Sequence, residues 1–311
     1  MKTITRIILL ALLALGCADA EKRKQVEGAP LISLTYTDDW ERSFTFQNPP
    51  QKVVSIAPNI TEIIFAIGAE DKLVGRSQAC DYPDEVLMFP EITTFPQLDL
   101  EQLKVLDADL IFSTDEIFTK DDLAQLDRLD FPVFIQHYED MQDIYRGIQK
   151  IGHVLQVDTA AQNLVDSLQT LEQRIIDSTE NQIKYQTMIL ISADPLKVVG
   201  GAGFLNQLIE KAGGKNVFAE NDEAYPEMTP EAILKAQPEF LILPSNDPQV
   251  YADLLAKYPI LYNTPADQLK QVHIIDPDHL YRPGPRTLTG LLELTHILHT
   301  QLNPQKFTDA F

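Results

Sequence analysis

Short apolar runs alternate with segments of helical periodicity through the first half of the chain. Four runs are typical of buried strands: Val53–Ile56, Leu73–Gly75, Leu110–Phe112 and Val133–Ile135. Polar and apolar positions between them repeat with helical spacing, and helices are expected to begin near Asn59, a candidate N-cap, Asp99, Lys120 and Asp140. Strands that alternate with helices in this way predict a parallel sheet covered by helices on both faces.

The second half of the chain repeats this alternation after one long segment of helical periodicity. Its apolar runs predict further strands at Met188–Ile191, Val198–Val199, Phe240–Leu243 and Val272–Ile275. A last helix is expected over Thr287–His299, and two alternating runs near the start, Ile32–Tyr36 and Ser43–Phe46, predict a β-hairpin.

The segment between the two halves contains no glycine and no proline from Asp158 to Ile183. Leu164, Leu168, Leu171 and Ile175 recur there at helical spacing, which predicts one helix of about 25 residues and nearly 40 Å in length. The predicted fold is therefore α/β, with two Rossmann-like lobes that contain parallel sheets and are joined by a single long backbone helix. Two lobes on one stiff helix would leave a cleft between them with little hinge motion.

A weak internal repeat supports two similar halves. Glu101 opens a helix that leads to Asp109 and an apolar strand, and Glu231 opens a helix that leads to Glu239 and another apolar strand. The offset is 130 residues at both acidic positions.

The first sixteen residues have the pattern of an export signal. Lys2 and Arg6 precede the apolar run Ile7–Leu15, which is too short to cross a bilayer as a helix. Residues 14–17, Ala-Leu-Gly-Cys, resemble the lipid-attachment box of bacterial lipoproteins, so Cys17 would become a lipidated N-terminus. Cleavage after the Ala-Asp-Ala of residues 18–20 is the alternative, and it would remove Cys17.

These boundaries divide the chain into five parts. The expected parts are a signal peptide (1–16), a lipidated N-terminus and tether (17–31), an N-terminal lobe with the hairpin (32–157), the backbone helix (158–183) and a C-terminal lobe (184–311). We expect an extracytoplasmic protein that is anchored to the membrane by its lipid.

Composition narrows the function further. The 311 residues carry a formal charge of −21, which becomes −23 when the signal removes two basic and no acidic side chains. This charge argues against nucleic acid as a partner, because phosphates require a basic surface. Only two cysteines are present, Cys17 and Cys80, so a disulfide framework is excluded, and Cys80 is expected to be a buried, unreactive thiol.

Four segments resemble a known family when they are taken together and in order: Val53–Glu62, Cys80–Pro83, Leu100–Glu101 with Asp109–Ile111, and Asp278–Arg286. The chain is similar there to the helical-backbone substrate-binding proteins of ABC importers, which bind cobalamin, ferric siderophores or haem, and most similar to the cobalamin binders. This resemblance implies a monomeric protein that is not an enzyme, has no resident cofactor, and delivers a metal chelate to a permease and ATPase complex.

The resemblance also implies roles for particular side chains. Ligand-contacting positions correspond to Tyr82, Phe95, Tyr225, Asp278 and Arg282. Two lobe-top glutamates that dock onto arginines of the permease correspond to Glu101 and Glu231, although acidic residues also suit the first turn of any helix. Aromatic side chains from both lobes would clamp a flat macrocycle.

Two other functions compete with that of a chelate binder. A protein that binds a zinc or manganese ion without a chelator would need three or four convergent ligands. His296 and His299, on one predicted helix, supply two of them. An enzyme is disfavoured because the sequence has no G-x-S-x-G, P-loop or H-E-x-x-H motif. Gly200–Gly203 lacks the spacing of a dinucleotide-binding loop and is better explained as a tight turn between a strand and a helix.

Overall fold

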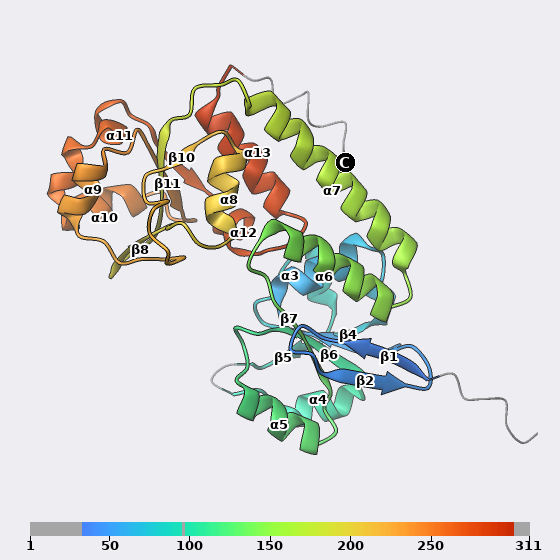
Figure 1. The fold of residues 1–311 in the computed structure, drawn as a ribbon. Helices are drawn as coiled ribbons and strands as arrows, with labels where there is room; N and C mark the ends of the chain where they lie inside the picture. Colours follow the sequence, from blue (N-terminus) through green and yellow to red (C-terminus); the bar gives the residue numbers. More distant parts are fainter. Residues whose placement is uncertain (1–32, 95–96, 302–311) are drawn as a thin grey trace, which may run out of the picture.

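Two α/β lobes meet along a layer of helices (Figure 1). This computed structural model describes residues 33–94 and 97–301. The predicted signal peptide, Cys17 and Phe95 lie outside these ranges. Within them, no helix combines the length and apolar character needed to cross a bilayer.

The N-terminal lobe is built on a parallel sheet with the strand order β5-β4-β3-β6-β7. Its strands are β3 (Val53–Ser55), β4 (Leu73–Ser77), β5 (Glu91–Ile92), β6 (Leu110–Thr114) and β7 (Val133–Gln136). Its helices are α3 (Pro58–Ala66), η1 (Glu70–Lys72), η2 (Asp84–Met88), α4 (Leu100–Leu106), α5 (Lys120–Arg128) and α6 (Met141–Val154). The predicted strands and helices of this half are confirmed, and the short strand β5 is an addition.

The predicted β-hairpin is also confirmed, and it covers the free edge of β7. Strands β1 (Leu34–Thr37) and β2 (Ser43–Phe46) pair antiparallel. In the turn between them, the buried carboxylate of Asp38 accepts a hydrogen bond from the Ile135 amide, and the Asp39 amide donates to the Ile135 carbonyl. An edge strand that is satisfied in this way cannot pair with another chain.

The C-terminal lobe has a sheet with the order β10-β8-β11-β12, and β9 pairs antiparallel with β8. Its strands are β8 (Gln186–Ala193), β9 (Leu196–Val198), β10 (Lys215–Asn216), β11 (Phe240–Pro244) and β12 (Val272–Ile275). Its helices are α8 (Phe204–Lys211), α9 (Pro230–Ala236), α10 (Val250–Lys257), η3 (Pro259–Asn263), α11 (Pro265–Gln268), α12 (Pro277–Tyr281) and α13 (Thr287–Leu298).

The long helix α7 (Asp158–Thr179) runs along one side of both lobes (Figure 1). Its buried face, including Leu168, Leu171 and Ile175, belongs to one apolar core that continues through α3, α6, α8 and α13. Two smaller cores fill the other face of each sheet. Because one core joins both lobes to α7, a change in the angle between the lobes would disturb close-packed side chains.

Three expectations need correction. Helix α7 ends at Thr179 rather than at residue 183. Strand β9 is antiparallel, because it returns directly after β8 through a two-residue turn, which leaves no room for a crossover helix. Asn59 is not an N-cap: the helix starts at Pro58, and the Asn59 side chain donates instead to the Pro283 carbonyl of the other lobe at 3.1 Å.

Candidate functional site

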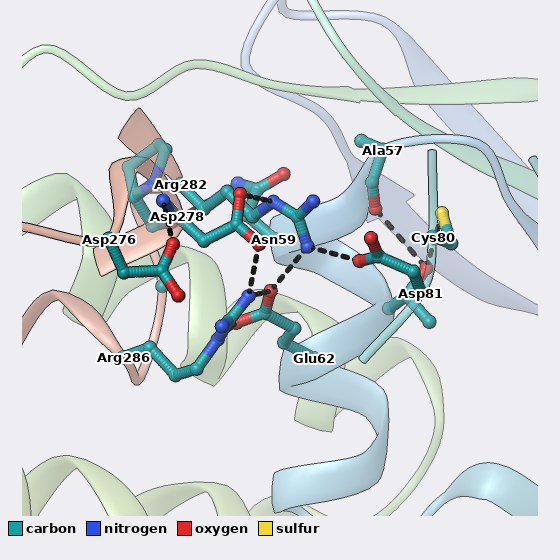
Figure 2. Close-up of polar contacts among 12 residues, drawn as sticks. Ala57, Asn59, Glu62, Cys80, Asp81, Asp276, Asp278, Arg282 and Arg286 are labelled. Carbon is teal, nitrogen blue, oxygen red and sulfur yellow. Dashed lines mark hydrogen bonds and ion pairs between the residues drawn. The ribbon is translucent and has the colours of Figure 1, made fainter. Parts of the chain in front are cut away.

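Charged side chains from the two lobes face one another where α3 approaches the segment between α12 and α13 (Figure 2). The N-terminal lobe supplies Glu62 from α3 and Asp81 from the loop that follows β4. The C-terminal lobe supplies Asp278 from α12, Arg282 just after it, and Arg286 just before α13. We call these five residues the interlobe cluster.

Glu62 is the centre of the interlobe cluster. Its side chain is 2% exposed, although it lies on a helix whose neighbouring positions are apolar. Arg286 donates to both of its oxygens, from Nε at 2.9 Å and from Nη2 at 2.6 Å, and Arg282 Nη1 lies 3.3 Å from Oε1. A buried carboxylate requires such partners, and the bidentate geometry of arginine supplies them.

Arg282 connects the remaining two carboxylates. Its Nη1 donates to Asp81 Oδ1 at 2.7 Å across the lobes, and its Nε lies 3.0 Å from Asp278 Oδ1 in its own lobe. The hydrogen bond from Arg282 lowers the pKa of Asp81 below its ordinary value. Burial alone would lower the pKa of Arg286, but its hydrogen bond and charge interaction with Glu62 outweigh burial and raise it. Asp81 and Arg286 are therefore held in their charged forms.

The charges of the interlobe cluster do not cancel. Glu62, Asp81 and Asp278 are three carboxylates against the two guanidinium groups of Arg282 and Arg286. Both arginines already bind carboxylates of the protein, so neither is held ready for an anionic ligand. The cluster as a whole presents a negative charge at the junction of the lobes.

Tyr82 contacts the interlobe cluster, and Tyr281 directly precedes Arg282 in the sequence. The ring of Tyr82 is 47% exposed and lies 4.2 Å from the guanidinium carbon of Arg286. In the other lobe, burial raises the pKa of Tyr225, and the charge of Glu116, which follows β6, raises it further. Burial, with a smaller effect of Tyr225, raises the pKa of Tyr281 to about 12. Tyr225 and Tyr281 therefore remain protonated at neutral pH, and all three rings are flat, partly apolar surfaces.

Cys80 precedes Asp81 but faces the interior. Its thiol is fully buried and lies within hydrogen-bonding distance of the Thr61 and Ser77 hydroxyls, at 3.0 and 3.2 Å. Burial raises its pKa, so the reactive thiolate is disfavoured. The prediction of a buried thiol is confirmed.

The two glutamates that were predicted to dock onto a permease occupy equivalent positions. Glu101 and Glu231 are exposed in the first turns of α4 and α9, two helices of seven residues that lie 130 positions apart in the sequence. The strands that follow, β6 and β11, keep the same offset, so the internal repeat is confirmed as a structural one. Figure 1 shows α4 and α9 in different lobes, far from α7.

The acidic residue eight positions after each glutamate has a structural task. Asp109 accepts hydrogen bonds from the amides of Gln51 and Lys52 just before β3. Glu239 accepts one from the amide of Gln186, the first residue of β8. These carboxylates satisfy amides at the start of a neighbouring strand, which explains why the repeat contains them.

Three of the predicted ligand residues, Tyr82, Asp278 and Arg282, come together around the interlobe cluster. Tyr225 is 41% exposed in the C-terminal lobe and takes no part in the hydrogen bonds and ion pairs of the cluster. The sequence patterns assign no role to Glu62 and only a turn to Arg286, yet among the described residues these two form the closest pair between the lobes. The sequence does contain a pattern that indicates a role for Glu62, which lies beside Ile60, Ile63 and Ile64 in an apolar helix. A charged side chain that is buried at such a position needs a partner.

The histidine pair of the rival metal-binding hypothesis does not converge. His296 is exposed on α13, whereas His299 is fully buried just after that helix ends. No group of three or more His, Cys, Asp or Glu side chains with metal-binding geometry occurs in the described part of the chain. The Gly200–Gly203 segment is a turn, in which the Gly200 and Gly201 amides donate to carbonyls of residues 224 and 221.

Comparison with known proteins identifies the family. The sequence model described as periplasmic binding protein matches residues 53–279, which is most of the chain and both lobes. The chain belongs to this family. Periplasmic binding proteins are transport components without catalytic activity, so the prediction that the chain is not an enzyme is confirmed by its family, as is the resemblance noted from sequence.

Individual relatives of this periplasmic binding protein differ in their named ligands. A vitamin B12-binding protein of Vibrio parahaemolyticus is 26% identical over 260 residues, covering 81% of this chain and 91% of its own length. An uncharacterized ABC transporter substrate-binding lipoprotein of Bacillus subtilis, YvrC, is 26% identical over 303 residues. The match covers 94% of this chain and 95% of YvrC. The solved structure of the periplasmic heme-binding protein RhuT from Roseiflexus matches with a TM-score of 0.71 at 24% identity. The match covers 84% of this chain and 98% of RhuT.

Proposed function

We propose that this periplasmic binding protein captures a metal chelate of the cobalamin type between its lobes and delivers it to the permease of an ABC importer. Family membership supports the transport role, and the names of its relatives support cobalamin and haem as the classes to consider. The protein would act as a monomer, with Tyr82, Phe95, Tyr225, Asp278 and Arg282 as ligand contacts. Phe95 lies outside the described residues.

The charge of the interlobe cluster is the observation that favours cobalamin. Haem carries two carboxylates, and each would have to compete with Glu62, Asp81 or Asp278 for a guanidinium group that is already paired. Separating the buried, hydrogen-bonded pair of Glu62 and Arg286 would cost about 2–5 kcal/mol, so the cluster opposes anionic ligands there. The rim of cobalamin carries neutral amides, which can donate to carboxylates and accept from arginine without displacing either.

The tyrosines favour the same choice. A phenol must lose its proton to bind ferric iron strongly, and the pKa values of Tyr225 and Tyr281 are both raised. As neutral rings they are suited to packing against a flat macrocycle instead.

Ligand identity can be tested by gel filtration with absorbance detection. Purified protein is mixed separately with cyanocobalamin, haemin and a ferric hydroxamate, and the colour that elutes with the protein is measured. We expect cyanocobalamin to co-elute at one equivalent per monomer and haemin to bind at least about tenfold more weakly, since the charge penalty exceeds 1.4 kcal/mol. Tighter binding of haemin, or no binding of any chelate, would refute the proposed ligand.

A variant with fewer carboxylates tests whether the charge of the cluster sets this selectivity. The double variant Asp81→Asn, Asp278→Asn removes two carboxylates from the cluster and leaves both arginines, so its affinity for haemin should rise by about tenfold. The matched control is Glu180→Asn, which removes an exposed carboxylate at the end of α7. A double variant that binds haemin no better than wild type would show that cluster charge does not set selectivity.

Docking onto the permease would use Glu101 and Glu231. Two exposed carboxylates, one on each lobe, can form two separated ion pairs with basic residues of a partner. Each exposed pair contributes only about 0–1 kcal/mol, so the two would orient the protein more than hold it.

Attachment to the membrane would occur through a lipid on Cys17. The lipoprotein name of one relative supports this choice over cleavage after Ala20. Mass spectrometry of the mature N-terminus distinguishes the two: a diacylglyceryl cysteine supports the anchor, and an unmodified Glu21 N-terminus contradicts it.

A further inference from the structure

A pocket of about 760 Å³ lies on the seam between the lobes, beside the interlobe cluster. Helices α3 and η2 of the N-terminal lobe form most of its wall, and the start of α13 closes it from the C-terminal lobe. The Glu62–Arg286 pair borders it, but Tyr225, Asp278 and Arg282 do not line it. Its volume falls in the range of small-molecule sites, and among the described residues proposed as chelate contacts Tyr82 is the one that lines it.

The pocket wall is mainly apolar and aromatic. Phe65 and Phe89 contribute two rings in an edge-to-face arrangement with centroids 6.0 Å apart, and Tyr82 adds a third. Met88 also lines the pocket and is 79% exposed, an unusual fraction for a side chain that is elsewhere used to fill cores. A bound molecule with an apolar body would cover these side chains.

The charge of the lining is negative. Arg286 is neutralised by its bidentate pair with Glu62. Glu70 and Glu85 also line the pocket, and neither makes an ion pair with any residue in the ranges 33–94 and 97–301. An apolar molecule that enters therefore meets two uncompensated carboxylates at the rim.

One wall of the pocket already holds a cation. The guanidinium carbon of Arg286 lies 4.2 Å from the centroid of the Tyr82 ring, in cation–π geometry. Aromatic rings combined with carboxylates are the chemistry that recognises organic cations, because the ring faces and the acidic groups both attract positive charge.

We propose that this seam pocket is a second binding site, specific for a small organic cation with an apolar body, such as a quaternary ammonium or phosphonium ion. The cation would touch α3 and η2 on one side and α13 on the other, so it would bind across both lobes. This site goes beyond the proposed chelate function and does not depend on it.

A pair of ions with the same shape and opposite charge provides the test. Isothermal titration of the full-length protein uses tetraphenylphosphonium as the probe and tetraphenylborate as its anionic match. We expect one phosphonium per protein and an affinity at least about tenfold higher than for the borate, because two rim carboxylates attract one ion and repel the other. Equal affinities, or tighter binding of the borate, would overturn the proposal.

Variants locate the site. Glu70→Gln with Glu85→Gln should reduce phosphonium affinity by about fivefold and bring the affinities of the two ions closer together. The control Glu180→Gln, just after α7, should change neither affinity. Ala66 is exposed on α3 and lines the pocket, so Ala66→Trp should fill the space without disturbing the core and abolish phosphonium binding. Unchanged binding by a folded Ala66→Trp protein would place the ion elsewhere and overturn the proposal.

Independence from the chelate is tested by repeating the titration with saturating cyanocobalamin. We expect phosphonium affinity to change by less than about threefold, since Tyr225, Asp278 and Arg282 do not line the pocket and Tyr82 is the described residue that both sites share. Competition between the two ligands would overturn the assignment of a separate site. If cyanocobalamin does not bind at all, the chelate proposal fails, but the phosphonium result stands by itself.

Discussion

Replacement of Glu62 by glutamine tests the physical basis of the interlobe cluster. The substitution keeps the shape of the side chain and removes its charge, which leaves Arg282 and Arg286 without their shared buried partner. Loss of one partner from a fully buried ion pair costs about 3–5 kcal/mol. Here the two arginine side chains are 16% and 14% exposed and keep other carboxylate contacts, so we expect a smaller loss of about 2–3 kcal/mol in the free energy of unfolding.

Urea unfolding at pH 7, followed by circular dichroism, measures this loss. The midpoint should move to lower urea while the slope stays the same, because the surface exposed on unfolding does not change. Glu101→Gln is the matched control, since Glu101 is exposed and unpaired by any described residue, and its effect should lie within about 0.5 kcal/mol. A Glu62→Gln protein as stable as this control would refute the reasoning.

A double-mutant cycle separates the pair from its surroundings. Suppose that Glu62 acts mainly through Arg286. The loss in the free energy of unfolding of the double variant Glu62→Gln, Arg286→Gln should then be smaller, by at least about 1 kcal/mol, than the sum of the losses of the two single variants. Strict additivity would mean that the contact between the lobes at 2.6 Å contributes nothing to stability.

Other predictions follow from the same structure. Lysine at both Glu101 and Glu231 should abolish uptake of the chelate in cells while its binding to purified protein stays unchanged; continued uptake would contradict the docking role. Because Arg282 lowers the pKa of Asp81, the contribution of this pair to stability is present above the unfolded-state pKa of about 3.9 and is lost as the pH falls through the lower folded-state pKa, so Asp81→Asn should flatten the acid limb of a stability–pH curve. Cys80 should react with a thiol reagent only after denaturation, and rapid labelling of the native protein would show that the buried thiol is accessible.

Local patterns were sufficient for most of the secondary structure. Strands such as β6 and β11 are continuous apolar runs because they are buried on both faces, and α4, α5 and α6 start after Asp99, Thr119 and Asp140, whose side chains accept hydrogen bonds from the first helical amides. The end of α7 could not be predicted to the residue, since no glycine or proline stands there. Short edge strands such as β5 and β10 have too few residues to form a pattern.

Local sequence patterns could not predict which side chains pair across the lobes. Asn59 has the residue type of an N-cap, but a partner 224 positions away takes its side chain, and Ala57 occupies the cap position instead. Glu62 finds its two arginines at similar separations. Nothing within one helix or one turn specifies such partners.

The sequence by itself determined the order of strands and helices, the two similar halves, the single long helix and the chemical types of the residues at the site, because these depend on periodicity and composition over short distances. Only the tertiary structure decided that one apolar core joins the two lobes to α7, that Glu62 is the centre of the interlobe cluster, and that an apolar pocket with an acidic rim opens beside it. These features depend on how two separately patterned lobes pack against the same helix, and the charge at their junction follows from that packing.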